Sequence, residues 1–229
     1  MSFGLLALSD FGLDQITTDF PQMYLWASGG TTVPAISSFD PTNWHTVSFS
    51  AVPTAASAGM MLFLRCTASG SFVVSKRLST SSFKVSVRNS VGGALSSYVE
   101  WRLYAKASAF SSIALPAYGI VTYSASGELM SRSDMKAWEA RNPLFFSKAE
   151  LVNASPVYKG TASSAPFVSS GASGMRIRQT SVGSTATYFD TGINVNGSNV
   201  SVFCYKPSAG KVFEDFDSVF STLPVALDY

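Results

Sequence analysis

The sequence predicts an all-β protein, an antiparallel β-sandwich arranged as two tandem sandwich domains of similar topology. Apolar and polar residues alternate with a period of two in several segments, which is the pattern of half-buried strands. Turn-forming clusters of Gly, Ser and Asn separate these segments at short intervals, as in sandwiches and barrels. With 229 residues, the chain is long enough for one large β domain or for two domains of about 100 residues each.

Three segments alternate most clearly: "SFKVSVRN" (82–89), "YVEWRLYAK" (98–106) and "NVSVFCY" (199–205). In the first segment the apolar residues Phe83, Val85 and Val87 share one predicted face. The polar residues on the other face are Lys84, Ser86 and Arg88. In the second segment Trp101 shares its face with Val99 and Leu103, so we expect this tryptophan in the core.

The sequence also predicts one tight hairpin and one ambiguous segment. Asn196-Gly197 lies between two strand-like runs, and both central positions of a type I′ hairpin turn need positive φ. Residues 131–143, "SRSDMKAWEARNP", have helix-forming residues with Ser133 as a candidate cap. The competing interpretation, which we favour, is a strand or a single turn, because the matching residues near the N-terminus have a strand pattern.

Two turn-rich segments are candidate places for partner contact. Residues 158–174 are rich in Ser, Gly, Ala and Pro, which predicts a long loop or an irregular arm. Residues 26–47 contain two prolines, two tryptophans and the only histidine in a turn-rich context. The C-terminal segment 212–229 is apolar almost to its end, so we expect it to pack as a final strand or against a neighbouring subunit.

The composition leaves two interpretations of the surface open. Charged residues make up only 13% of the chain and hydrophobic residues 46%, with a net charge of +2. Surface charge normally supports solubility, so the surface is either a Ser- and Thr-rich β surface or one that is covered in an assembly. The small, dispersed charge argues against nucleic acid as a partner. Arg176 and Arg178 share one predicted strand face, as on a solvated face.

No catalytic or metal-binding motif is present, so we expect a non-enzymatic protein with no cofactor and no metal. The only histidine, His45, has no nucleophile signature near it. A hydrolase remains a third alternative because of one acidic cluster, which lacks the spacing of a calcium loop: Glu214, Asp215 and Asp217. Cys66 and Cys204 lie in apolar runs of different predicted halves, which argues against a disulfide between them.

Aromatic side chains are the remaining candidates for contact with a partner or receptor, since Trp and Tyr stack on sugar rings and anchor interfaces. Trp26 and Trp44 flank turn-rich segments, so we expect these two to be exposed if any tryptophan is, although the core is the default place for each. The candidate contact residues are Trp26, Trp44, His45, Tyr158 and Phe167.

The N-terminal stretch "FGLLALSDFGLDQITTD", which starts at Phe3, has a counterpart, "YGIVTYSASGELMSRSD", which starts at Tyr118, 115 residues downstream. The identical positions are Gly4 and Gly119, Ser9 and Ser124, Gly12 and Gly127, and Asp19 and Asp134. Each copy predicts a hairpin: a strand, a turn in which Gly supplies positive φ, and a second strand.

This hairpin resembles the start of minor tail and tail-tip proteins of long-tailed bacteriophages. The shared pattern is an aromatic-Gly-apolar opening, an "S/N-x-x-G" turn and a polar "(T/S)-D", and it covers residues 3–19 and 118–134. One departure is that Thr18 and Ser133 stand where the family has an aromatic residue before the Asp.

The resemblance implies tandem sandwiches over residues 1–109 and 118–229, joined by a linker at 110–117. It also implies a structural protein of the virion tail, located at the tail tip, fibre base or collar. Such a protein is expected to form a trimer or hexamer, to dock to other tail proteins, and to take part in attachment to a host surface receptor. The alternative is a receptor- or glycan-binding sandwich. Because the sequence shows no export signal or membrane segment, we expect assembly in the host cytoplasm without membrane insertion.

Overall fold

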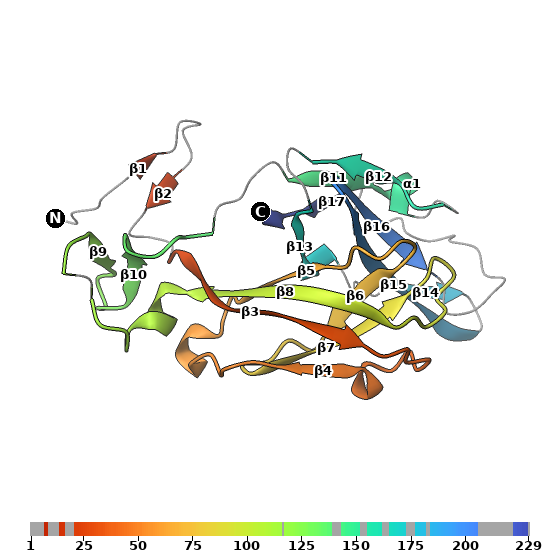
Figure 1. The fold of residues 1–229 in the computed structure, drawn as a ribbon, viewed down its shortest axis with the longest axis horizontal. Helices are drawn as coiled ribbons and strands as arrows, with labels where there is room; N and C mark the ends of the chain where they lie inside the picture. The colour runs from red at the N-terminus through yellow and green to blue at the C-terminus, as the bar shows by residue number, and fades with distance from the viewer. Residues whose placement is uncertain are drawn as a thin grey trace.

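The chain forms an antiparallel β-sandwich, as the sequence predicts (Figure 1). The computed structural model describes residues 7–8, 14–16, 21–115, 117–138, 143–151, 155–161, 165–172, 177–181, 184–205 and 222–228. One sheet has five strands in the order β18 (Leu227–Asp228), β13 (Phe167–Ser169), β5 (Met61–Arg65), β8 (Ser97–Lys106) and β3 (Met23–Val33). All strand pairs in it are antiparallel.

The second sheet has seven strands. Its order is β12 (Tyr158–Gly160), β16 (Asn199–Tyr205), β15 (Ser184–Asn196), β6 (Phe72–Lys76), β7 (Ser82–Arg88) and β4 (His45–Ser48), with β14 (Ile177–Ser181) paired to β15. Three separate two-stranded sheets join β1 (Ala7–Leu8) to β2 (Asp14–Ile16), β9 (Val121–Tyr123) to β10 (Leu129–Arg132), and β11 (Leu144–Ser147) to β17 (Thr222–Val225). The helical segments are α1 (Lys148–Leu151) and the 3-10 turns η1 (Pro41–Asn43), η2 (Thr54–Ala56), η3 (Ala107–Phe110) and η4 (Ser170–Ala172).

The core lies between the two sheets and uses the apolar faces that the alternation predicts. Phe83 is fully buried, and its ring meets Trp101 edge to face with centroids 5.7 Å apart. The facing strands contribute apolar side chains with a period of two, and the buried set includes Val73, Val85, Val87, Val99, Leu103, Ile193, Val195, Val200 and Val202. The prediction that Trp101 belongs to the core is confirmed.

Part of the opposite face of the seven-stranded sheet is also buried, which the half-buried pattern of β7 does not predict. Ser86 and Arg88 are both almost completely buried, because the segment after β3 folds across this face. The Arg88 guanidinium lies over the Phe39 ring, 4.4 Å from its centroid, and donates to the carbonyl of Ser38 at 2.5 Å. A second apolar cluster forms there around Trp44.

The predicted turns are partly confirmed. β15 and β16 form the expected hairpin, but Asn196 pairs with Asn199, so the central residues are Gly197 and Ser198. Only Gly197 of these two has positive φ, +57°, which is the pattern of a type II′ turn rather than type I′. In residues 131–138 the chain forms the end of β10 and a turn, which confirms the preference for a strand or turn over a helix.

The expectation of one long loop at 158–174 is wrong, since β12 and β13 form within it. The expected packing of the C-terminal segment is confirmed over its described residues. β17 pairs with β11, and β18 pairs with β13 at the edge of the five-stranded sheet. β17 and β18 therefore pair with backbone groups of β11 and β13 that would otherwise lie unpaired at a sheet edge.

The division into two separate sandwiches at residues 110–117 is not confirmed. Strands from both predicted domains share both sheets: β13 lies beside β5, and β15 pairs with β6 through Ile193 and Val73. The strands before residue 109 leave the edges of β5 and β6 unpaired, and strands of the later segment complete those sheets. The described chain therefore has one sandwich to which both segments contribute.

Candidate functional site

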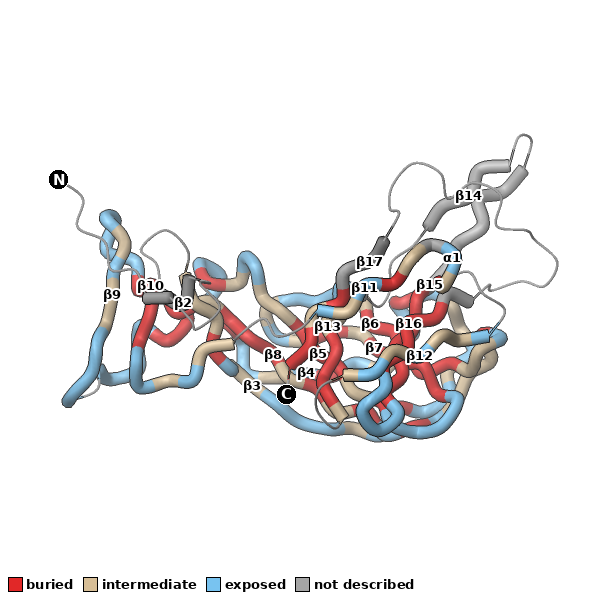
Figure 2. The backbone as a smooth tube through the Cα atoms, turned by 90° about the horizontal axis from the view of Figure 1, so that it is seen from above, coloured by how far each residue is buried: buried red, intermediate tan, exposed pale blue. Residues whose placement is uncertain are grey.

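The most distinctive surface feature is the β9–β10 hairpin, which lies at one end of the molecule, away from the sandwich (Figures 1 and 2). Its turn has the predicted chemistry. Gly127 has φ +81°, its N–H donates to the Ser124 carbonyl, and the Ser124 N–H donates to the Glu128 carbonyl. Glycine is the residue that takes such a φ without steric cost, so the prediction of a Gly-containing hairpin at residues 118–134 is confirmed.

The first predicted hairpin has the same strand pairing. In β9–β10, Thr122 lies opposite Ser131 and Tyr123 lies opposite Leu129, so the pairing skips one residue of β10. In β1–β2, Ala7 lies opposite Ile16 and Leu8 lies opposite Asp14, again with one residue skipped. Each residue pair of the first hairpin falls on a pair of the second at the predicted offset of 115. Gly4, Gly12 and Asp19 lie outside the described residues.

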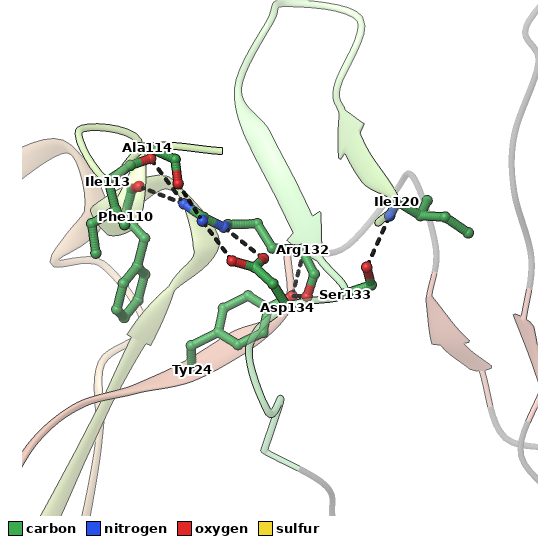
Figure 3. Close-up of polar contacts among 8 residues, drawn as sticks. All are labelled: Tyr24, Phe110, Ile113, Ala114, Ile120, Arg132, Ser133 and Asp134. Carbon is green, nitrogen blue, oxygen red and sulfur yellow. Dashed lines mark hydrogen bonds and ion pairs between the residues drawn. The ribbon is translucent and has the colours of Figure 1, made fainter. Parts of the chain in front are cut away.

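Arg132 fastens the β9–β10 hairpin to the rest of the protein (Figure 3). Its side chain is only 1% exposed. The guanidinium donates to the carbonyls of Phe110, Ile113 and Ala114 at 3.3, 3.0 and 2.8 Å. It also forms a bidentate ion pair with the Asp134 carboxylate, with N–O distances of 3.0 and 2.8 Å. A planar guanidinium suits this site because it offers several donors in a fixed geometry.

Asp134 and Ser133, the "SD" of the repeat, complete this anchor. The hydrogen-bonded Arg132 guanidinium lowers the pKa of the Asp134 carboxyl. The Ser133 hydroxyl accepts from the Ile120 N–H at 2.8 Å, and the Ser133 N–H donates to the Ile120 carbonyl, which closes the base of the hairpin. Gly119, just before it, has φ +144°. The four identical positions of the second repeat, Gly119, Ser124, Gly127 and Asp134, therefore lie at the turn and the base of the hairpin.

Tyr24 joins the same anchor to the long β3–β8 ribbon. Its hydroxyl donates to the Arg132 carbonyl at 2.9 Å and accepts from the Arg132 N–H at 2.6 Å. Burial raises the pKa of this tyrosine, so it stays a protonated donor at neutral pH. The hairpin is therefore held by polar contacts to a buried core residue.

Exposed large apolar side chains are concentrated in the chain at this end of the molecule. Of the eleven large hydrophobic side chains that are exposed in the described chain, five lie within residues 113–123: Ile113, Leu115, Tyr118, Ile120 and Tyr123. Tyr118 is 94% exposed. We call this group the hairpin patch. Contiguous exposed apolar surface marks interaction sites more often than single exposed residues do.

The structure places three of the predicted contact residues differently from expectation. Trp44 is only 2% exposed and donates to the Ser38 carbonyl, so it takes the default place of a tryptophan, in the core. Phe167 is buried between two guanidinium groups, with Arg65 and Arg102 at 4.2 and 4.1 Å from its ring centroid. Trp26 is half-buried, and its indole donates to the Ser50 carbonyl at 2.7 Å. These rings stabilise the sandwich.

The other two predicted contact residues keep some exposure but lie apart from the hairpin patch. Tyr158 is exposed on β12, and its hydroxyl donates to the Asn194 side chain at 3.0 Å. His45 lies on β4 with Nε2 3.3 Å from the Thr31 hydroxyl, which links β4 to β3. No described carboxylate bonds to this ring, so the described residues do not form a catalytic triad around it.

The sequence interpretation did not identify the hairpin patch or Arg132 as functional residues. A signal for the patch was present, because Tyr118 and Ile120 belong to the aromatic-Gly-apolar opening of the repeat. Arg132 belongs to both the repeat and the helix candidate, and neither pattern marks it as a site residue. Its two-residue spacing from Asp134 would place both on one side of an extended segment, and this spacing was the signal for the ion pair.

The described residues contain no group of three His, Cys, Asp or Glu side chains that could hold a metal ion, and no described helix is long and apolar enough to span a membrane. The acidic cluster at 214–217 lies outside the described residues. Cys66 is free and buried, and burial raises the pKa of its thiol. Comparison of the chain with protein-family models, curated proteins and solved structures finds no significant match.

Proposed function

We propose that the chain is a non-enzymatic structural protein that acts by assembly, with the hairpin patch as its main docking surface. One observation carries the proposal: almost half of the exposed large hydrophobic side chains of the described residues lie in one stretch of eleven residues. Burying apolar surface is the main driving force of protein association, so a surface of this kind supports binding to another protein.

The way the hairpin is held supports the same role. An isolated two-stranded hairpin is at best marginally stable in water, yet this one is tied down by Arg132 and Tyr24. A docking surface that is already ordered loses less conformational entropy on binding. The polar anchor therefore leaves the apolar side chains of the hairpin free for a partner.

The resemblance of the hairpins to tail proteins gives this proposal its biological setting. We propose a minor tail or tail-tip component of a tailed bacteriophage, assembled as a trimer or hexamer in the host cytoplasm and docked to other tail proteins. The low charge content of 13% supports a surface that is covered in the assembly.

A second candidate function is binding of a host receptor or glycan. The observation in its favour is that Tyr118 and Tyr123 are both exposed in the hairpin patch, and tyrosine rings stack on sugars. The tyrosines of the patch thus replace Trp26 and Trp44 as the candidate stacking residues.

The test is the oligomeric mass of the purified protein, measured by light scattering after size exclusion. We expect a defined oligomer for the native chain and a shift to smaller species for Leu115→Lys/Tyr118→Lys, which places two charges in the hairpin patch. Val91→Lys is the matched control, because Val91 is 79% exposed on the turn between β7 and β8, far along the chain from the patch.

If the native chain is a monomer at its highest soluble concentration, self-assembly is wrong. Binding of the tyrosines to a glycan array would then favour the receptor-binding alternative. If the patch variant and the Val91 variant weaken the oligomer equally, the hairpin patch is not the docking surface.

A further inference from the structure

β3 differs from the other strands at the sheet edges. It has eleven residues, Met23–Val33, and none of them is charged. The other described edge strands are β4 with four residues, β12 with three, β18 with two and β14 with five. Proteins usually protect sheet edges by keeping them short or by placing charges on them. β3 is neither short nor charged, and its one irregularity is a shift of register between Leu25 and Ala27, before the exposed residues 28–30.

The outer edge of β3 lacks described backbone partners over most of its length, while the Trp26 and Thr31 side chains bond to Ser50 and His45. β8 pairs with it from Met23 to Val33. On the other side, the Trp138 N–H donates to the Met23 carbonyl and Tyr24 bridges to Ala137. Beyond Tyr24, the described residues provide no further backbone partner on that side. Figure 2 shows the strand at the rim of the molecule, and its residues 28–30 and 32 are exposed.

Two glycines let the neighbouring aromatic rings lie across the strand. A Cβ at Gly29 would meet the Trp101 ring at 2.9 Å, and one at Gly30 would meet the Tyr98 hydroxyl at 2.0 Å. The rings of β8 therefore cover both faces of β3 at these two glycines. The strand presents a fixed row of backbone groups with no bulky side chain at its centre, which suits the addition of another strand.

We infer that the outer edge of β3 pairs with the same edge of a second copy of the chain, antiparallel across a two-fold axis. An axis at Gly30 sets this glycine against the partner's Gly30. It also sets Ser28 against the partner's Thr32, so small polar residues face one another. No charge meets a like charge, because the strand has none. An isologous contact of this kind needs a self-complementary edge.

A second copy fits this edge better than a different partner does. Charge complementarity normally selects a foreign partner, and β3 has no charge with which to select one. Self-pairing joins the two five-stranded sheets into one continuous sheet of ten strands. It adds a second contact to the assembly proposed above and uses a separate surface, so either contact can fail without the other.

Two variants of opposite charge pattern test the inference. In Ser28→Lys/Thr32→Lys, lysine faces lysine at two symmetric places in the paired edge. In Ser28→Lys/Thr32→Glu, lysine faces glutamate at the same two places. Like charges directly opposite each other destabilise a strand pair and opposite charges stabilise it. We expect dimer dissociation constants that differ by about tenfold or more between the two variants.

The measurement is light scattering as a function of concentration, in the Leu115→Lys/Tyr118→Lys background, so that only the edge contact remains. Residues 28 and 32 are exposed and lie four positions apart on the same strand, so both variants should unfold at the temperature of their background. The expected result is a dimer in that background, retained with glutamate at 32 and weakened with lysine.

Equal dissociation of the two variants, or a monomeric background protein, overturns the self-pairing of β3. A different result contradicts the proposed function: an oligomer whose mass is unchanged by Leu115→Lys/Tyr118→Lys. The two results can be told apart because each uses its own pair of substitutions.

Discussion

The sandwich and the hairpin end differ in how far a buried charged side chain adds to apolar packing. In the sandwich, apolar side chains such as Phe83 and Val85 point inward and are fully buried. At the hairpin end, the buried anchor is the charged Arg132, and apolar side chains such as Tyr118 and Ile120 point to the surface. Figure 2 shows a red interior in the sandwich and, at the other end, a red β10 next to exposed pale-blue segments that flank β9.

This difference bears on which apolar residues are needed for folding and which are available for binding. Burial of a side chain such as Phe83 contributes about 1.5–3 kcal/mol to folding. The side chain of Tyr118 contributes almost nothing, since it is 94% exposed. At the hairpin, Leu129 packs in the hydrophobic core cluster and Arg132 adds a polar anchor. The Tyr118 side chain takes part in neither contact, so the surface chemistry of this end is separate from its stability.

The largest expected effect is in the sandwich. Phe83→Ala removes a ring that packs against Trp101 and Phe49, so the free energy of unfolding should fall by about 3–5 kcal/mol. Tyr118→Ala removes an aromatic ring from the hairpin patch and should change it by less than about 0.5 kcal/mol. Urea unfolding of the two variants measures both values. Equal losses would contradict the separation of the two regions.

The second effect is confined to the hairpin end. Arg132→Met leaves the Asp134 carboxylate and three carbonyls without their donor, which should cost about 2–3 kcal/mol. We expect hydrogen exchange to accelerate in residues 120–123 and 129–133, with little change in 82–88. Asp134→Asn keeps an acceptor near the guanidinium and should have a smaller effect.

An equal loss of protection across β7 would mean that the hairpin and the sandwich unfold as one unit. Local loss alone would show that Arg132 orders the hairpin without contributing to the core. Either outcome separates the two regions more sharply than a global stability measurement does.

The sequence predicted the strands and turns that are specified by residues close together in the chain. Alternation at 82–89 and 98–106 identified β7 and β8, and the repeat identified the β9–β10 turn through Gly127. These features depend on residues that are neighbours in the chain. Period-two patterns and glycine conformations report them directly.

The missed features depend on contacts between distant residues. Ser86 and Arg88 are polar, yet they are buried, because the segment around Phe39 covers their face of the sheet. Phe167 became a buried strand residue because Arg65 and Arg102 enclose its ring. No local pattern reports which segment folds over which sheet face. For the same reason, the sequence does not reveal that strands of both predicted domains belong to the same two sheets.

The smallest predicted effect is a pH dependence that distinguishes the two regions by their carboxylates. Hydrogen bonding to Arg132 lowers the pKa of Asp134 at the hairpin, and hydrogen bonding to Arg65 lowers the pKa of Glu100 on β8. A carboxyl whose pKa is lower in the folded state stabilises the fold above its unfolded pKa of about 4. This stabilisation is lost as pH falls through the lower, folded value.

We therefore expect the urea midpoint of the native chain to fall between about pH 5 and pH 3, since both carboxyls become protonated there. Asp134→Asn and Glu100→Gln should each make this fall shallower, because each removes one titrating group. Hydrogen exchange at pH 3 assigns the loss: residues 120–133 respond to Asp134, and residues 61–65 with 97–106 respond to Glu100. A variant whose acid response matches that of the native chain would mean that its ion pair is too well solvated to matter, as exposed pairs often are.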